Sequence, residues 1–107
     1  MKVMNCVAYA CCAKAQPVSH SLINQYKQVE RYCEWNALKL VETYVEFHVD
    51  TGNPDLLALQ HIMEKQMDER PFDLLITTEY AINGVDPSKA ERIEQMLEAL
   101  DMPIIVL

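Results

Sequence analysis

The chain has 107 residues, enough for one domain with a single hydrophobic core, and half of them are apolar. Sixteen acidic residues against nine basic ones give a formal net charge of −7, and the basic residues are scattered singly. This balance disfavours a DNA-binding module that acts alone, because such modules need clustered Lys and Arg to displace counterions from phosphates.

The apolar run Val3–Ala10 predicts a strand that is buried on both faces. The polar stretch Lys14–His20 predicts a loop, and a helix is then expected from Ser19 or Ser21 to about Trp35. Residues three and four positions apart mark the apolar face of this helix: Leu22, Tyr26, Val29 and Cys33.

The segment Ala37–Phe47 alternates Leu with polar residues and then becomes β-branched, which indicates a second strand. A break follows at "DTGNPD", where Asn53 is expected to cap a helix whose first residue is Pro54. A third buried strand is predicted over Phe72–Thr78. The expected apolar face of the intervening helix consists of Leu56, Leu59, Met63 and Met67.

A turn is expected at Asn83-Gly84, and Asp86 with Pro87 then predicts the start of the last helix. The run Pro103–Leu107 predicts a final strand. The stripe of this last helix consists of Ala90, Ile93, Leu97 and Leu100.

The resulting order is β-α-β-α-β-α-β, with helical crossovers between runs of Val, Ile and Leu. This order predicts one α/β domain over residues 1–107, with three layers and a mostly parallel sheet covered on both faces. Ligands of such sheets bind at the carboxyl ends of the strands. Here those positions are 11–16, 47–53 and 78–84, so any chemistry is expected there.

Several segments in this order resemble the catalytic domain of serine site-specific recombinases, the resolvase/invertase family. The first strand "VAYA", the helix start "SLINQ" (Ser21–Gln25), "VETYVE" with "DTGN", "FDLLIT" and "IEQMLEALDMPIIVL" carry the resemblance over nearly the whole chain. The resemblance implies the recombinase fold. In that family, a serine attacks a DNA phosphodiester and arginines stabilise the transition state.

The residues that would perform this chemistry are missing. The family's Tyr-x-Arg-x-Ser motif, read from Tyr9, places the arginine at Cys11 and the serine at Ala13. Read backward from Gln16, it places the serine at Cys12. The arginine-bearing segments after the second and third strands are replaced by "NPDLL" and "TTEYAINGV". Together with Gln25 of the helix start, these positions are interpreted as a degenerate active site.

We therefore expect a catalytically inactive resolvase-like domain that acts as a protein-interaction or regulatory module in DNA recombination, in a phage or a mobile element. The expected partner is a recombinase, another protein of the same element or a second copy of the chain, without direct DNA binding. An apolar turn offers Tyr80, Ile82 and Val85 as the contact surface.

Two alternatives stay open. In the first, Cys12 (or Cys11) serves as a substitute nucleophile with His20 or His48 as its base. In the second, the carboxyl edge holds a small polar ligand through uncharged side chains, which are Gln16, Gln25, Thr77 and Thr78.

No cofactor or metal is expected, because the cysteines and histidines lack the spacing of a zinc site. Glu46, His48 and Asp50 are interpreted as a solvated loop. The absence of C-x-x-C pairs favours cytosolic thiols and a cytoplasmic protein. Although Lys2 and "AKA" mimic a signal peptide, the apolar run is short and contains Asn5. No stretch has the roughly 20 apolar residues of a membrane span.

Overall fold

The structure is a computed structural model, and it describes residues 3–13, 20–48, 56–84 and 89–107. In chain order the elements are β1 (Asn5–Ala13), α1 (His20–Trp35), β2 (Lys39–His48), α2 (Leu57–Asp68), β3 (Leu74–Thr77), the π-helix η1 (Tyr80–Gly84), α3 (Ala90–Ala99) and β4 (Ile104–Val106). No helix within these ranges is both long and apolar enough to cross a membrane.

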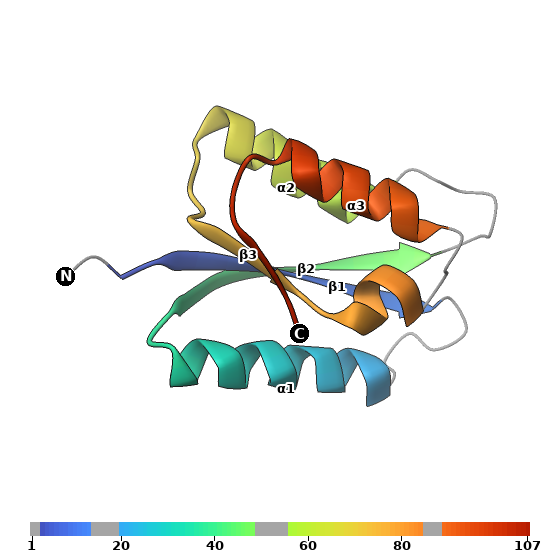
Figure 1. Cartoon of the computed structure of the whole chain (residues 1–107), viewed down its shortest axis with the longest axis horizontal. Helices are drawn as coiled ribbons and strands as arrows, with labels where there is room; N and C mark the ends of the chain where they lie inside the picture. The colour runs from blue at the N-terminus through green and yellow to red at the C-terminus, as the bar shows by residue number, and fades with distance from the viewer. Residues whose placement is uncertain (1–2, 14–19, 49–55, 85–88) are drawn as a thin grey trace.

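The four strands form one sheet in the order β2-β1-β3-β4, and all neighbouring pairs are parallel. Helix α1 covers one face of the sheet, while α2 and α3 cover the other (Figure 1). The three-layer α/β architecture predicted from the sequence is thereby confirmed, and the sheet is entirely rather than mostly parallel among the described strands.

Alternate residues of β1 face two separate cores. Val7, Tyr9 and Cys11 pack in the layer of α2 and α3, whereas Cys6 and Ala8 pack against α1. The expected stripe of α3 is confirmed, since Ile93, Leu97 and Leu100 are buried in the first core and Ala90 packs against it. Both faces of β1 are therefore buried, as its continuous apolar sequence predicted.

Two expected element boundaries are wrong. Strand β1 extends to Ala13, so Cys11 and Cys12 lie within the strand rather than after it. Helix α2 begins at Leu57, because Leu56 adopts a left-handed conformation (φ 48°) that cannot continue a helix backward. The expected cap Asn53 and first residue Pro54 lie outside the described residues.

The buried face of α2 also differs from the expected stripe. Met67 is 80% exposed, whereas Ile62 and Gln66 are buried. Gln66 is accepted in the interior because its side-chain amide pairs with the backbone of Phe72, donating from Nε2 to the carbonyl (3.0 Å) and accepting from the amide (3.2 Å). A polar residue thus occupies a buried position of the helix, seven residues after Leu59 and on the same face.

Each α-helix is followed by a residue of positive φ two positions after its last helical residue. These residues are Ala37 (54°), Arg70 (50°) and Asp101 (52°). After α1, Leu38 N donates to Cys33 O (2.9 Å), which completes a Schellman-type ending. Glycine usually occupies this position, but the chain has only two glycines, so each of these helix endings holds a residue with a Cβ in a strained conformation.

Candidate functional site

Strands β1, β2 and β3 end along one edge of the sheet, which is the edge where the sequence predicted a site. The buried polar side chains near this edge come from three elements or their ends: Gln25 of α1, Glu46 of β2, and Thr77 with Thr78 at the end of β3. Their hydrogen bonds determine whether these side chains are available to bind a ligand.

Gln25 joins α1 to β1 through the backbone of Cys11. Its Nε2 donates to the carbonyl oxygen of Cys11 (2.8 Å), and the amide of Cys11 donates to its Oε1 (3.1 Å). The β1–β3 ladder ends at the pair Ala8–Ile76, so beyond that point β1 has lost its neighbour on this side. The side-chain amide of Gln25 replaces the missing strand and satisfies the buried peptide group.

Two threonines extend this network toward η1. Thr77 donates from Oγ1 to the carbonyl oxygen of Tyr9 (2.8 Å), and Thr78 donates from Oγ1 to Gln25 Oε1 (3.4 Å). The Thr78 hydroxyl also accepts a bond from the amide of Ala81 (3.0 Å) and so caps η1. Among the described residues, no buried side-chain nitrogen or oxygen lacks a hydrogen-bond partner.

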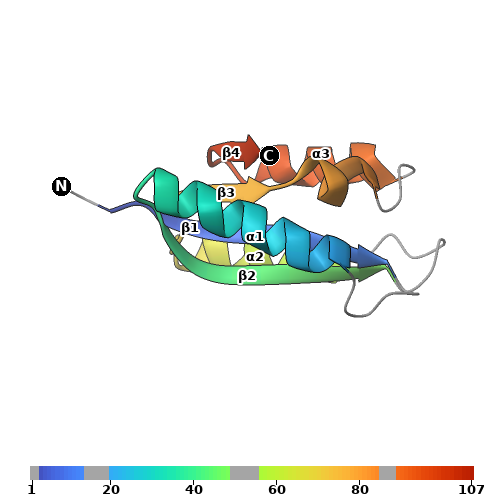
Figure 2. The ribbon, with the colours of Figure 1, turned by 90° about the horizontal axis from the view of Figure 1, so that it is seen from below.

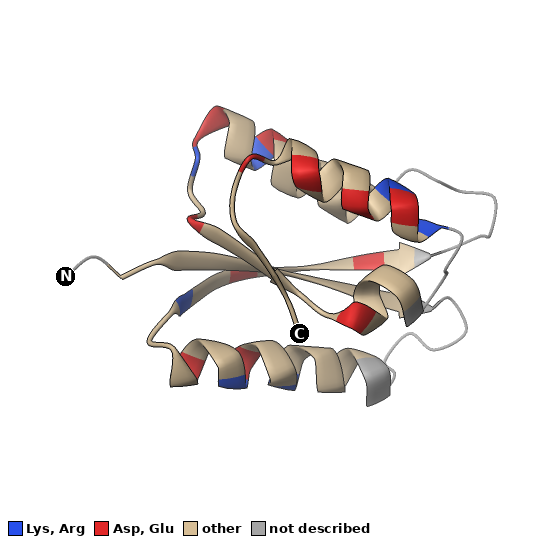
Figure 3. Ribbon diagram, viewed as in Figure 1, with Lys and Arg blue, Asp and Glu red and all other residues tan. Residues whose placement is uncertain are grey.

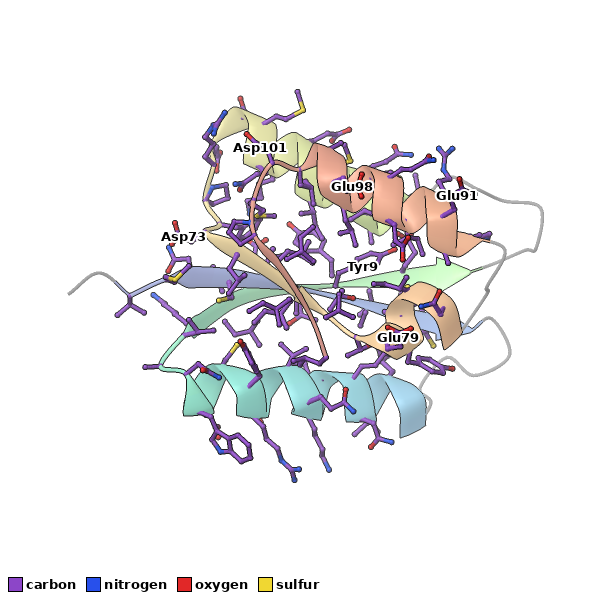
Figure 4. The ribbon with its side chains drawn as sticks, in the orientation of Figure 1. Tyr9, Asp73, Glu79, Glu91, Glu98 and Asp101 are labelled. Atoms are coloured by element: carbon purple, nitrogen blue, oxygen red, sulfur yellow. The ribbon has the colours of Figure 1, made fainter. Side chains whose placement is uncertain are left out.

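Glu46 holds the start of α2 from within β2. Its Oε1 accepts from the amide of Ala58 (3.0 Å), and its Oε2 accepts from the amide of Leu59 (3.2 Å) and from the hydroxyl of Tyr9 (3.0 Å). A carboxylate at a helix N-terminus satisfies free amides and interacts favourably with the helix dipole. Tyr9 projects from β1 into the layer of α2 and α3 (Figure 4), and its burial raises the pKa of its hydroxyl.

Cys11 and Cys12 are both fully buried. Burial is the largest cause that raises the pKa of the Cys11 thiol to about 12, and the negative charge of Glu46 acts in the same direction. At neutral pH this thiol is protonated, whereas a nucleophilic cysteine requires a lowered pKa and an accessible sulfur. The Cys11 thiol therefore has the properties of a core residue.

None of the three arginines takes part in the hydrogen bonds of this network. Arg31 is exposed on α1, Arg70 follows α2 near the amino edge of the sheet, and Arg92 is exposed in the first turn of α3. Acidic residues predominate on α3, as Figure 3 shows. Lys89 is buried at the start of α3, and its charge lowers the pKa of Cys11 against the larger effect of burial.

Several other predicted site residues lie wholly or in part outside the described residues. Gln16 and Val85 lie outside the described residues, and so do the side chains of Ala13, His20 and His48. Among the described residues, no group of three His, Cys, Asp or Glu is arranged to hold a metal ion.

Three further expectations can be examined directly. Tyr80 is 36% exposed, but Ile82 is 4% exposed and belongs to the core of the α2 and α3 layer, so it cannot form part of a contact surface. The expected turn at Asn83-Gly84 is a π-helix instead. Glu46, interpreted from the sequence as part of a solvated loop, is a buried residue of β2.

The parallel strand order β2-β1-β3-β4, with helices on both faces of the sheet, is a three-layer α/β fold that the chain shares with serine recombinase catalytic domains. The chain is similar to the C-terminal catalytic domain of ISC1926 TnpA, an IS607-like serine recombinase, with a TM-score of 0.69 and 19% identity. This match covers 96% of the chain and 67% of the solved one.

The chain is also similar to the N-terminal catalytic domain of TP901-1 integrase, with a TM-score of 0.67 and 13% identity over 96% of the chain and 76% of the solved one. The resemblance found in the sequence motifs is confirmed for the fold. No family model matches the sequence, and no curated protein matches it either.

Sequence reasoning missed the role of Glu46, although a signal was present. Glu46 lies between the apolar residues Val45 and Phe47, 12 residues before the amide that it caps, and an acidic residue in such a setting requires a partner if it is buried. The interpretation failed because the helix start was assigned to Asn53 and Pro54, which left no free amides for Glu46 to bind.

Proposed function

We propose that the chain is a serine-recombinase-like domain without strand-transfer activity that acts as a protein-interaction or regulatory module in DNA recombination. One observation carries the proposal: the family's arginine position, read from Tyr9, and its serine position, read backward from Gln16, hold the fully buried Cys11 and Cys12, and Cys11 is fixed through its backbone by Gln25. Read from Tyr9, the serine position holds Ala13, which has no nucleophilic atom. A nucleophile for phosphoryl transfer must instead reach a phosphate from the surface.

The distribution of positive charge supports the proposal. Phosphoryl transfer accumulates negative charge on the phosphate oxygens, and removing a single stabilising donor costs roughly 10²–10³ in rate. None of the three arginines belongs to the network at the carboxyl edge. The charge of Lys89 acts on Cys11, but a lysine lacks the planar, bidentate geometry with which arginine binds phosphate.

The hydrogen bonding of the edge argues against the small-ligand alternative. Gln25, Thr77 and Thr78 were its candidate ligand-binding residues, and all three bond to the protein itself. A receptor site requires polar groups directed at the ligand. The context of recombination is supported by the fold, since the two solved structures described above are recombinase or integrase catalytic domains by name.

The loss of strand transfer is tested by incubating the purified chain with supercoiled plasmid DNA. We expect no nicking and no covalent protein–DNA adduct, for the wild type and for Cys12→Ser alike. An adduct that forms with the wild type and disappears in Cys12→Ala would overturn the proposal and establish Cys12 as a nucleophile.

The interaction role is tested with a purified serine recombinase from the source organism. We expect the chain to bind it and to change its rate of strand exchange, and Tyr80→Ala to weaken binding at least tenfold. Tyr26→Ala is the matched control, because Tyr26 is also an exposed tyrosine on a helix (44% against 36% for Tyr80). No binding and no change in strand-exchange rate would contradict the role.

A further inference from the structure

Two of the four cysteines meet at the amino end of the sheet, on the side away from the carboxyl edge. Cys6 is the second residue of β1, and Cys33 lies in the last turn of α1. Because α1 runs antiparallel to β1, its last turn lies over the start of the strand, as Figure 2 shows. Both side chains belong to the core between α1 and the sheet, where Cys6 is 0% and Cys33 is 4% exposed.

The two thiols are hydrogen-bonded to each other. Burial is the largest cause that raises the pKa of both groups, and their mutual bond adds to the rise at Cys6 but opposes it at Cys33. Cys6 is therefore the donor and Cys33 the acceptor, because a hydrogen bond donated to a thiolate favours its formation. The carbonyl oxygen of Met4, 4.0 Å from Cys6 Sγ, is a second acceptor for the same proton. The two sulfurs are thus neighbours, and a disulfide bond requires them to approach to about 2 Å.

The other two cysteines are not placed to join this pair. Cys11 belongs to the core on the opposite face of the sheet. By the alternation of β1, Cys12 shares the face of Cys6, but six residues separate them, which is about 20 Å along a strand. Cys11 and Cys12 themselves are neighbours in the strand, so their side chains point to opposite faces. Oxidation within the folded chain is therefore confined to Cys6 and Cys33.

We propose that Cys6 and Cys33 are an oxidation site that takes a low-molecular-weight disulfide as its co-substrate and forms a disulfide bond between β1 and α1. In the first step the Cys33 thiolate attacks one sulfur of the small disulfide, whose S–S bond breaks, and the released thiolate takes up the proton that Cys33 lost. In the second step Cys6 loses its proton and attacks the sulfur of Cys33, and the second small thiol leaves with that proton. The chain loses two hydrogen atoms, and the small disulfide is reduced to two thiols.

The order of attack follows from the surroundings of the two sulfurs. The thiolate is the attacking species, and the hydrogen bond from Cys6 stabilises this form of Cys33. The backbone of Cys6 is held between Leu40 of β2 and Leu74 of β3, whereas Cys33 lies at a helix end, where local opening costs least. Opening of the last turn of α1 admits the reagent to Cys33 first, and Cys6 then resolves the mixed disulfide.

The bond closes a loop that contains the whole of α1. Such a cross-link restricts the unfolded chain, so the oxidised protein resists unfolding more than the reduced one. Gln25 already joins the first half of α1 to β1, and the disulfide fastens the other end. The site involves neither Tyr80 nor Cys12, so the inference does not depend on the proposed function.

The test is incubation of the folded full chain with excess oxidised glutathione at pH 8, followed by mass spectrometry. We expect a product lighter than the reduced chain by the mass of two hydrogen atoms. Its urea midpoint should be higher and should return to the original value with dithiothreitol. Digestion with chymotrypsin, which cuts after Tyr9 and so separates Cys6 from Cys11 and Cys12, should yield a peptide pair that joins Cys6 with Cys33.

Cys33→Ser should not give this product, whereas the matched control Cys12→Ser should give it as the wild type does. Cys6→Ser should acquire one glutathione at Cys33 at least tenfold faster than Cys33→Ser acquires one at Cys6, and equal rates would contradict the order of attack. Circular dichroism must show that these variants are folded.

The wild type alone keeps the inference falsifiable if a variant does not fold. A folded wild type that stays reduced, while the same chain in 8 M urea is oxidised, overturns it. So does a wild type that retains glutathione at Cys33 without forming the bond, or one whose bond maps to Cys11 or Cys12.

Discussion

Gln25 of α1 and Cys11 of β1 are paired like residues of neighbouring strands, through bonds of 2.8 and 3.1 Å between a side-chain amide and a peptide group. The pair lies where β1 extends beyond the ladder of β3. The glutamine thus extends the sheet by one pair of hydrogen bonds and fixes the first helix on it. The resemblance to recombinases assigned this residue to an active site, and the geometry assigns it a structural role.

Gln25→Ala should destabilise the chain by about 2–3 kcal/mol, because it leaves a buried amide and a buried carbonyl of Cys11 without partners. Urea unfolding followed by circular dichroism measures this loss. Gln28→Ala is the control on the exposed face of the same helix, and its effect should stay within about 0.5 kcal/mol. Equal effects of the two substitutions would contradict the structural role of Gln25.

Glu46→Ala should cost about 2–4 kcal/mol, since the amides of Ala58 and Leu59 and the hydroxyl of Tyr9 lose their acceptor together. The loss should be concentrated at the start of α2, where amide hydrogen exchange at Ala58 and Leu59 should accelerate. Glu64→Ala, on the exposed side of α2, should leave these exchange rates unchanged. Unchanged exchange in Glu46→Ala would show that α2 has another cap.

The free energy of unfolding should fall as the pH rises above about 9. Burial raises the pKa of Cys6 to about 11 and that of Cys11 to about 12, from an ordinary value of 9.0. Below pH 9 both thiols are protonated in the folded and unfolded states, and their contribution to stability is complete. Above it the unfolded chain releases these protons first, and stability declines until the folded pKa values are reached.

Urea unfolding between pH 7 and 10.5 measures this dependence. The variant Cys11→Ala should show a shallower decline than the wild type, because it lacks one of the thiols whose pKa burial raises, which are Cys6, Cys11 and Cys33. Identical slopes would show that Cys11 does not contribute.

Both cysteines of the carboxyl edge should resist modification in the folded chain. With a maleimide at pH 7 to 8, Cys11 and Cys12 should react at least 100-fold more slowly than free cysteine, because both sulfurs are inaccessible to solvent. The same residues should react fully in 8 M urea, which serves as the control. Modification of either residue faster than free cysteine would support the alternative of a cysteine nucleophile.

Ala37→Gly should stabilise the chain by about 1 kcal/mol, because Ala37 is exposed and has a φ of 54°, a conformation that glycine adopts without strain. Ala99→Gly is the matched control within α3, where glycine should destabilise by about 0.5–1 kcal/mol. Thermal unfolding should therefore move in opposite directions for the two variants. A loss of stability in Ala37→Gly would contradict the account of this helix ending.

The order of the elements and their parallel arrangement followed from the sequence, because apolar runs and helical stripes report burial directly. Boundaries were less predictable. Cys11 and Cys12 have little preference for strand over loop, and the hydrogen bonds that continue β1 past β3 come from Gln25, 14 residues away. The start of α2 depends on the left-handed conformation of Leu56, which its side chain does not indicate.

The sequence indicated where the polar side chains of the carboxyl edge gather, but it did not indicate that they form hydrogen bonds within the protein. The strand ends do converge, and Gln25, Thr77 and Thr78 do meet there. Sequence spacing does not reveal whether a polar side chain bonds to the protein or remains available to a ligand, because that depends on contacts between distant segments. The same reason explains why Ile82 was assigned to the surface.

The mutual hydrogen bonding at the carboxyl edge has a consequence for the evolution of such a domain. Under the proposed function, a serine substituted at Cys11 or Cys12 would not supply a nucleophile, because it would be as inaccessible as the cysteine. A productive path would first have to loosen the bonds of Gln25 and lower stability before any chemistry was gained. Under the proposed function, sequences that gain strand transfer are therefore separated from the present one by less stable intermediates.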